Sequence, residues 1–327
     1  MAAWARAVRG LLLDVSGVLY DSGDGGGVPI AGSVEAVSSE VADAVEQIRK
    51  PMDKIRKPTS PHPEHLLSSF VDVVIADGHK GVKPSRMCPD SFCFAQAFQK
   101  RIKASGLKLR FCTNETQATR EEFVKKLQGL GFDISVAEVT APAPAACRIL
   151  KERNLRPHLL VHDDLVPEFA GIDKANPNCV VIGDAAENFT YANLNEAFRV
   201  LIGMEKPVLI SLGRGRYYKE TDGLKLDVGA YMKALEYACD IEAEVVGKPA
   251  GMFFESALAE MGVPAQQAIM IGDDIVNDVG GAQRCGMRGV QVRTGKYRPS
   301  DENHPHVKPD AYVNNLAEAV DVILQQM

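Results

Sequence analysis

The sequence lacks the features that mark secreted, membrane-spanning or zinc-stabilised proteins. Its seven cysteines are odd in number and show no Cys-x-x-Cys spacing, so they indicate neither a disulfide framework nor a zinc site. No apolar run approaches the length needed to cross a bilayer, and the N-terminal run is interrupted by Asp14. We therefore expect a protein of a reducing compartment without a cleaved signal, located in the cytoplasm, with a nuclear location left open.

An excess of basic charge is missing as well. The formal net charge of -6 and the pI of about 5.7 argue against non-specific binding to nucleic acid or to a membrane surface. Local basic clusters such as residues 100–103 are interpreted as solvated helix faces. A length of 327 residues and a mean hydropathy of -0.10 are typical of a soluble globular protein with room for two domains. The oligomeric state is not fixed by the sequence, and a homodimer stays open.

The stretch that organises the chain is GLLLDVSGVLY, residues 10–20. Its leucines follow one another without polar alternation, which predicts a strand buried on both faces of a parallel sheet, and Gly17 marks the point where the chain leaves that sheet. Asp14 then lies beyond the carboxyl end of a strand, where open α/β sheets bind ligands. An aspartate that simply ends an ordinary strand is the alternative at this point.

The segment after this strand is less regular. The glycine-rich residues 21–27 lack the Lys-Ser/Thr pair of a nucleotide-binding P-loop and are interpreted as a flexible loop, followed by a helix that begins near Ile30. Prolines then punctuate KPMDKIRKPTSPHPEH and disfavour regular structure, before a short strand over residues 70–76. We predict that residues 38–101 are an insertion, in large part poorly ordered.

Strands and helices alternate from residue 107 onward. The strand LKLRFCTN is followed by a helix that stops at Gly131, and residues 140–244 repeat the alternation on a smaller scale, with strands HLLVHD, NCVVIGD and PVLISLG. Behind them, a Lys-Pro pair precedes a helix and a buried strand runs into Gly-Asp-Asp. The last predicted strand covers residues 289–292, and a helix over 316–325 closes the chain.

These patterns predict an α/β fold of two parts. A Rossmann-like, doubly wound parallel sheet is expected to form the core from residues 1–139 and 245–327. A smaller α/β domain is expected to be inserted between them, over residues 140–244.

Four element ends carry polar residues of complementary kinds. They are, in chain order, Asp14, then Thr113 with Asn114, then Lys248, and finally Asp273 with Asp274. Together these residues match what phosphoryl transfer through an enzyme carboxylate requires: a nucleophile, a hydroxyl and an amide for phosphate oxygens, a cation, and acidic ligands for Mg²⁺.

The same stretches resemble a known family. DVSGVLY, FCTNE, VVGKP and GDDIVND are similar to motifs one to four of the haloacid dehalogenase superfamily, and the segment with VVIGDAAENFTYANLNEAF resembles the C2-type cap of its p-nitrophenylphosphatase-like branch. DVSGVLYDSG, VTAPAPAAC, GRGRYYKET and GDDIVNDVGGAQRCGMR resemble a subgroup whose substrates are phospholysine, phosphohistidine and inorganic pyrophosphate. The resemblance covers nearly the whole chain except residues 38–101.

The resemblance implies a role for each motif residue. Asp14 is the nucleophile that forms an aspartyl-phosphate, and Lys248 neutralises its charge and that of the phosphate. The site residues that the resemblance implies are Asp14 and Lys248 for catalysis; Ser16, Thr113, Asn114 and Glu115, with the catalytic pair, for the phosphoryl group; Asp14, the carbonyl of Ser16 and Asp273 for Mg²⁺; and Asp274 and Asp278 for orienting waters and Lys248.

One position departs from the superfamily pattern. Most of its phosphatases carry a second aspartate two positions after the nucleophile, as general acid for the leaving oxygen, and this chain has Ser16 there. An unactivated hydroxyl is a poor proton donor near neutrality, so part of the usual ~10²–10⁴-fold acid–base contribution is missing at this place. Phosphoramidates and pyrophosphate need less help, and the departure agrees with the substrates that the resemblance implies.

Several other stretches are interpreted as structural. Gly81 to Pro84 imitates the third motif but precedes the second, and Gly183-Asp184 imitates the fourth but is interpreted as a strand-end turn. The remaining stretches are His162 to Asp164, a solvated turn; GRGRYY, a loop that lines the substrate entrance; and Cys179 with Cys239, core residues.

Two further functions stay open beside the phosphatase. One is a catalytically weak scaffold or interaction protein of the same fold, and the other is a phosphatase for small phosphate monoesters. Because Asp14, Lys248 and Asp273 are all present, the sequence favours the enzyme.

Overall fold

The computed structural model describes residues 8–23, 27–30, 102 and 105–325, and all structural statements below refer to these residues. The predicted insertion at residues 38–101, the strand at 70–76, residues 31–37 of the helix expected from Ile30, and the Lys-Pro pair at 83–84 that imitates the third motif lie outside them. No helix in the described part of the chain combines the length and the apolar character that crossing a membrane requires.

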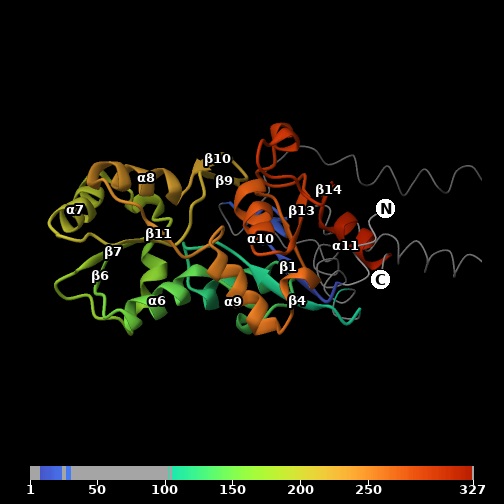
Figure 1. Cartoon of the computed structure of the whole chain (residues 1–327), viewed down its shortest axis with the longest axis horizontal. Helices are drawn as coiled ribbons and strands as arrows, with labels where there is room; N and C mark the ends of the chain where they lie inside the picture. The colour runs from blue at the N-terminus through green and yellow to red at the C-terminus, as the bar shows by residue number, and fades with distance from the viewer. Residues whose placement is uncertain (1–7, 24–26, 31–101, 103–104, 326–327) are drawn as a thin grey trace, which may run out of the picture.

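Two parallel sheets divide the molecule into two lobes (Figure 1). The larger sheet has six strands in the order β14-β13-β12-β1-β4-β5, and the smaller has four in the order β11-β8-β7-β6. The strands of the larger sheet are β1 (Gly10–Leu13), β4 (Lys108–Cys112), β5 (Val139–Thr140), β12 (Ala268–Gly272), β13 (Arg288–Val292) and β14 (Ala311–Val313). Those of the smaller sheet are β6 (Pro157–Leu160), β7 (Cys179–Ile182), β8 (Leu209–Ser211) and β11 (Glu244–Val245).

The larger sheet is covered on both faces, and β1 shows why its sequence does not alternate. Leu11 and Leu13 belong to a core shared with α5 (Arg120–Gly129) and α11 (Leu316–Leu324). Leu12 points to the opposite face, into a second core with Phe253 and Phe254 of α9 (Gly251–Met261). Successive side chains of a strand point to opposite faces, so a strand between two helical layers needs apolar residues throughout. The predicted doubly wound α/β core is confirmed.

The smaller sheet repeats this design. One face packs against α6 (Pro142–Glu152), through residues such as Ala146 and Ile149. The other face packs against α7 (Tyr191–Ile202) and α8 (Val228–Cys239), whose Leu201 and Met232 are buried there. This lobe therefore has cores of its own, as a separate folding layer requires.

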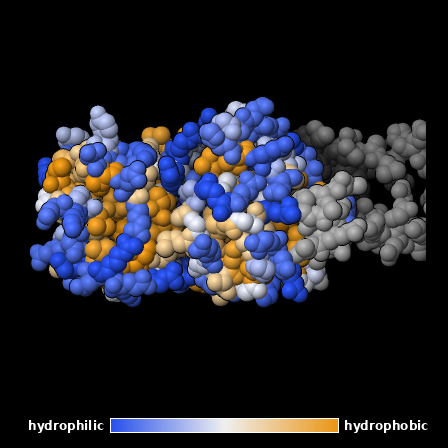
Figure 2. Space-filling model, in the orientation of Figure 1, coloured by the Kyte–Doolittle hydropathy of each residue, from blue (hydrophilic) through white to orange (hydrophobic). Residues whose placement is uncertain are grey.

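Two residue pairs of the sheets lie close to the expected domain boundaries. Thr140 pairs with Cys112 in the larger sheet, and Val245 pairs with Ser211 in the smaller one. The exact limits of the inserted domain, residues 140–244, stay a prediction. Figure 2 shows hydrophilic side chains over much of the visible face, with apolar ones between them on both lobes.

Several elements differ from the sequence prediction. The strand over residues 289–292 is not the last, because β14 pairs with it at the sheet edge. GRGRYY is not all loop, since Tyr217 and Tyr218 begin β9 (Tyr217–Glu220), which pairs with β10 (Gly223–Leu226). The flanks of the glycine-rich loop also pair, as β2 (Tyr20–Asp21) and β3 (Val28–Pro29). These strands are too short for a period of two to reveal them.

The helix expected after β12 has an unusual start. Residues Ile275–Gly280 form a π-helix, which continues into α10 (Gly281–Arg284). Such wide turns are rare and occur frequently at functional sites. The π-helix carries Asp278 toward the site described next.

Candidate active site

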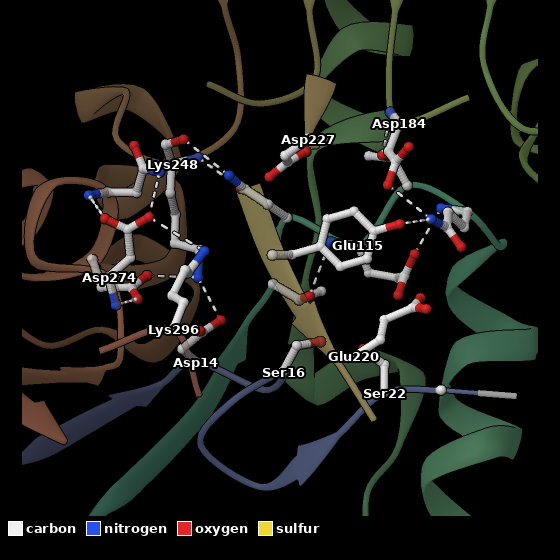
Figure 3. A pocket seen from close by; sticks show the side chains of 18 of the residues that line it. Asp14, Ser16, Ser22, Glu115, Asp184, Glu220, Asp227, Lys248, Asp274 and Lys296 are labelled. Atoms are coloured by element: carbon white, nitrogen blue, oxygen red, sulfur yellow. Dashed lines mark hydrogen bonds and ion pairs between the residues drawn. The ribbon is translucent and has the colours of Figure 1, made fainter. Parts of the chain in front are cut away.

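The residues selected from the sequence meet at one edge of the six-stranded sheet. β1, β4 and β12 are parallel neighbours. Asp14, Thr113 and Asp273 directly follow these strands, so they share the edge at which the strands end. Lys248 comes to the same place on the loop between β11 and α9, and Figure 3 shows it next to Asp14.

Lys248 lies between two carboxylates. Its Nζ is 2.6 Å from Oδ1 of Asp14 and 2.7 Å from Oδ1 of Asp278, and all three side chains are buried. Burial by itself lowers the pKa of a lysine, but the two carboxylates outweigh this effect and raise the pKa of Lys248 above its ordinary value. Lys248 is therefore a permanent positive charge beside the carboxylate expected to attack phosphorus.

Asp278 completes this buried cluster. Burial raises the pKa of its carboxyl to about 7, with the charge of Asp14 acting in the same direction and Lys248 opposing it. Its Oδ2 accepts a hydrogen bond of 3.0 Å from the backbone N–H of Asp274. Asp278 contacts the ammonium of Lys248 directly, as a residue that orients Lys248 would have to.

The carboxylate of Asp273 is a fitting place for a cation. Its Oδ2 accepts a hydrogen bond of 2.9 Å from the backbone N–H of Lys296, while its buried Oδ1 has no hydrogen-bond partner among the described residues. Burial raises its pKa well above the ordinary value; the positive charge of Lys296 opposes this, and the charges of Asp14 and Asp278 reinforce it. Oxygens of Asp14, Asp273 and Asp278 lie within 4.8 Å of one another. Hard divalent cations prefer such an oxygen set, and one would satisfy the orphaned Oδ1.

Two glycines let the backbone close around Asp273. Gly17 has φ 81° and Gly295 has φ 59°, in the left-handed region that glycine adopts without strain. A Cβ atom would lie only 2.1 Å from Oδ2 of Asp273 at Gly17 and 2.0 Å at Gly295. The hydroxyl of Thr294 donates a 2.5 Å hydrogen bond to the carbonyl of Gly17 and holds the two loops together. Gly17 thus serves close approach as well as the turn predicted from the sequence.

The side chains of Thr113 and Asn114 form hydrogen bonds with the protein backbone. The Oγ1 of Thr113 accepts a 3.0 Å hydrogen bond from the N–H of Glu115. Asn114 makes a paired contact with the backbone of Lys248: its Nδ2 donates to the carbonyl at 2.9 Å, and its Oδ1 accepts from the N–H at 2.8 Å. The amide expected to hold the phosphoryl group therefore positions Lys248, while Thr113, Asn114 and Glu115 all line the cavity.

Lys296 was missed by the sequence analysis. It follows Gly295 in the loop after β13, and its Nζ lies 3.2 Å from Oδ2 of Asp274. Asp274 also accepts hydrogen bonds of 2.9 Å from the N–H groups of Val276 and Asn277, at the start of the π-helix. Burial opposes ionisation of Asp274, yet Lys296 and these N–H groups hold its pKa below the usual value. Asp274 therefore contacts Lys296 and not Lys248.

A signal for Lys296 existed in the sequence. Because β13 neighbours β12 in a parallel sheet, its end reaches the same edge, and the segment TGKY that follows it places a lysine there.

Most of the residues described above line one side of a cavity of about 260 Å³. The lobe of the smaller sheet, called the cap lobe below, closes the other side. Asp184, which follows β7, and Tyr218 of β9 line it, as do Glu220 and Asp227. Gln117 joins the two lobes: its Nε2 donates to Oδ2 of Asp184 at 2.7 Å and to the hydroxyl of Tyr218 at 3.2 Å. Asp184 is therefore more than the strand-end turn expected from the sequence, since its carboxylate faces the site (Figure 3).

The other sequence candidates divide between site and scaffold. Ser16 lines the cavity as expected. His162 accepts a hydrogen bond from the N–H of Asp164 at the start of a short 3-10 helix, as a turn residue does. Cys179 is buried in the core on the α6 face of the smaller sheet, and Cys239 is packed against the core on the opposite face.

Comparison with known proteins gives matches along the whole chain. A family described as "Haloacid dehalogenase-like hydrolase" matches residues 92–175, and one described as "HAD-hyrolase-like" matches residues 245–319. The phospholysine phosphohistidine inorganic pyrophosphate phosphatase of Xenopus laevis is 58% identical over 99% of this chain and 97% of its own length. The human protein of the same name is 57% identical over 99% of this chain and 98% of its own length. Haloacid dehalogenase-like hydrolase domain-containing protein 2 of Bos taurus is 44% identical over 71% of this chain and 89% of its own length.

Solved structures agree with the fold. The 4-nitrophenylphosphatase of Thermotoga maritima superposes with a TM-score of 0.69 at 20% identity, over 98% of this chain and 99% of that one. The p-nitrophenyl phosphatase of Archaeoglobus fulgidus gives 0.67 at 20% identity, over 96% and 99%. At these identities the likeness concerns the fold, and it confirms the predicted sheet core with an inserted α/β cap.

Proposed function

The chain belongs to the haloacid dehalogenase-like hydrolases, and from this we propose that it is a Mg²⁺-dependent phosphatase acting through a phosphorylated Asp14. Its proposed substrates carry P–N bonds, as in phosphohistidine and phospholysine, or are inorganic pyrophosphate. The family membership confirms the resemblance that the motifs indicated. The names of the relatives at 57% and 58% identity support phosphatase activity and this choice of substrates.

The observation that carries the proposal is the buried contact between Asp14 and Lys248. Removing charged groups from water costs several kcal/mol per ion in real proteins, and a pair recovers this only partly. A scaffold of the same fold would be as stable, or more so, with apolar residues at these positions. The buried charges therefore favour an enzyme over an interaction protein.

The geometry supports Asp14 as the nucleophile of the first chemical step. Lys248 holds Oδ1, which leaves Oδ2 as the oxygen available for in-line attack on phosphorus. The bond to the leaving nitrogen or oxygen breaks with its electron pair, and the phosphoryl group remains on Asp14. Water then hydrolyses this acyl phosphate and restores the carboxylate. Lys248 screens the charge that accumulates between Asp14 and the phosphoryl oxygens.

A divalent cation would be held by Asp14, Asp273 and the carbonyl of Ser16, with Asp278 close by. When bound, it supplies positive charge to the phosphoryl oxygens and fixes their position. Thr113 and the backbone beside Glu115 are proposed to hold the phosphoryl group. With about 260 Å³, the cavity is small for a ligand site, and it suits a single phosphorylated side chain or pyrophosphate.

The direct test is release of inorganic phosphate from phosphohistidine and from pyrophosphate. We expect release by the wild-type chain with Mg²⁺, little release with a chelator in its place, and none from Asp14→Asn. A wild-type chain that releases no phosphate from either substrate, with or without Mg²⁺, would be the scaffold. Activity confined to small phosphate monoesters would favour the second alternative.

A further inference from the structure

Asp227 is an acidic side chain of the cavity that the proposed reaction does not use. Most other carboxylates of the cavity are engaged: Asp14 and Asp278 with Lys248, Asp274 with Lys296, Asp184 with Gln117, and Glu220 with Lys225. Asp227 differs from these. Its Oδ1 accepts a 2.6 Å hydrogen bond from the N–H of Val228, and its Oδ2 has no hydrogen-bond donor among the described residues.

Asp227 is held on the cap side of the cavity, across from Asp14. It is the N-cap of α8, which fixes its backbone, and Figure 3 shows its carboxylate turned into the space above Asp14 and Ser16. Gly215 closes over it: a Cβ atom at Gly215 would lie 1.7 Å from Oδ2 of Asp227. The loop that begins with GRGRYY thus shields this carboxylate from water on one side and leaves it facing the cavity on the other.

The surroundings keep Asp227 protonated to a higher pH than an ordinary aspartate. Burial raises its pKa to about 6. The charge of Lys296 and the hydrogen bond from the N–H of Val228 lower this pKa, and the charges of Asp184 and Asp274 raise it. Tyr218 also faces it, and the charge of Asp227 contributes to the raised pKa of that phenol. A general acid works best when its pKa lies near the operating pH, which an ordinary aspartate does not meet.

We propose that Asp227 is the general acid of this enzyme. It takes the role of the aspartate that most superfamily phosphatases carry at the position of Ser16. The inference rests on the proposed function. As Asp14 attacks, the bond from phosphorus to the leaving oxygen breaks, its electron pair stays on that oxygen, and the proton of the Asp227 carboxyl moves to it. A phosphoramidate that carries its own proton on nitrogen needs this transfer less. The resulting Asp227 carboxylate then accepts a proton from the water that attacks the acyl phosphate on Asp14, and both groups return to their first state.

The variant Asp227→Asn isolates this role. Asparagine is an equally good N-cap, so α8 keeps its start, but the side chain no longer carries an acidic proton. The test compares kcat/KM for two substrates: an alkyl phosphate ester, whose alkoxide leaving group needs a proton, and 4-nitrophenyl phosphate, whose phenolate leaves without one. The ratio of the two cancels damage common to both.

We expect Asp227→Asn to lower kcat/KM for the alkyl phosphate ester by about 10²-fold and that for 4-nitrophenyl phosphate by less than about tenfold. The limb of the pH profile set by the protonated acid should disappear. Asp164→Asn, an exposed carboxylate of the same lobe, is the matched control and should change neither rate. Adding Ser16→Asp to Asp227→Asn should recover part of the lost ratio, because it places an acid where most superfamily phosphatases carry one.

Equal losses for both substrates, no loss for either, or an unchanged pH limb would overturn the role of Asp227. Failure of the proposed function looks different, because the wild-type chain itself would then release no phosphate from a phosphoramidate or from pyrophosphate. The comparison of the alkyl phosphate ester with 4-nitrophenyl phosphate still tests Asp227 in that case.

Discussion

The two sides of the cavity differ in how their charges are held. On the core side, Asp14 and Asp278 both contact the ammonium of Lys248 within a buried cluster. On the cap side, Asp227 and Asp184 are held by backbone N–H groups and an amide, with no lysine in contact. The core side therefore holds its carboxylates against a buried cation, whereas these two carboxylates on the cap side have only neutral hydrogen-bond donors as partners.

The sharpest way to break the core side is to remove the nucleophile. Asp14→Asn keeps the shape of the side chain but loses the charged oxygen, so we expect kcat to fall by about 10⁴-fold or more for every substrate. The measurement is steady-state phosphate release, with circular dichroism to confirm the fold. Near-normal turnover would rule out Asp14 as the nucleophile.

Removing the cation should have the next largest effect. Lys248→Ala leaves Asp14 and Asp278 buried without their shared partner, and we expect kcat/KM to fall by about 10²–10³-fold. Lys125→Ala is the control, since Lys125 is an exposed lysine whose side chain is 67% accessible. An unchanged kcat/KM in Lys248→Ala would mean that the site draws its positive charge from elsewhere, with Lys296 as the nearest candidate.

The metal prediction concerns stability and needs no substrate. A cation that binds only the folded chain raises the melting temperature, and saturating Mg²⁺ should do so by roughly 5 °C. Asp273→Asn removes a charged ligand and should abolish most of this rise, while NaCl at equal ionic strength should not produce it. A rise of the same size in Asp273→Asn would place the cation at other residues.

The smallest expected effect concerns Asp227 on the cap side, and it is a difference in the pH dependence of stability. The pKa of Asp227 is raised from 3.8 to about 6 in the folded chain, so the folded state binds more protons than the unfolded state between these values. Its contribution to stability is therefore present at low pH and is lost as the pH rises through about 6. Urea unfolding at pH 4.5 and pH 7 should show a smaller fall in stability for Asp227→Asn than for the wild type. Equal falls would mean that Asp227 titrates normally.

The same contrast explains what the sequence reveals. Asp14, Thr113 and Asp273 stand directly behind strands, and the parallel sheet brings such positions to one edge, so motif and pattern were sufficient to find them. Asp227 precedes a helix and reaches the site only because the cap lobe folds over the core. Asn114 lines the cavity, but its pairing with the backbone of Lys248 depends on loops 134 residues apart. Contacts of this kind follow from the packing of whole lobes, which local patterns do not encode.

The central claim is that the phosphoryl group passes through Asp14, and trapping that intermediate tests it most directly. The full chain would be mixed with a phosphoramidate and Mg²⁺, quenched in acid within one turnover, digested and analysed by mass spectrometry. The account predicts a phosphorylated peptide that contains Asp14 in the wild type and none in Asp14→Asn. Turnover without any phosphorylated peptide, or a phosphoryl group on another residue, would contradict it.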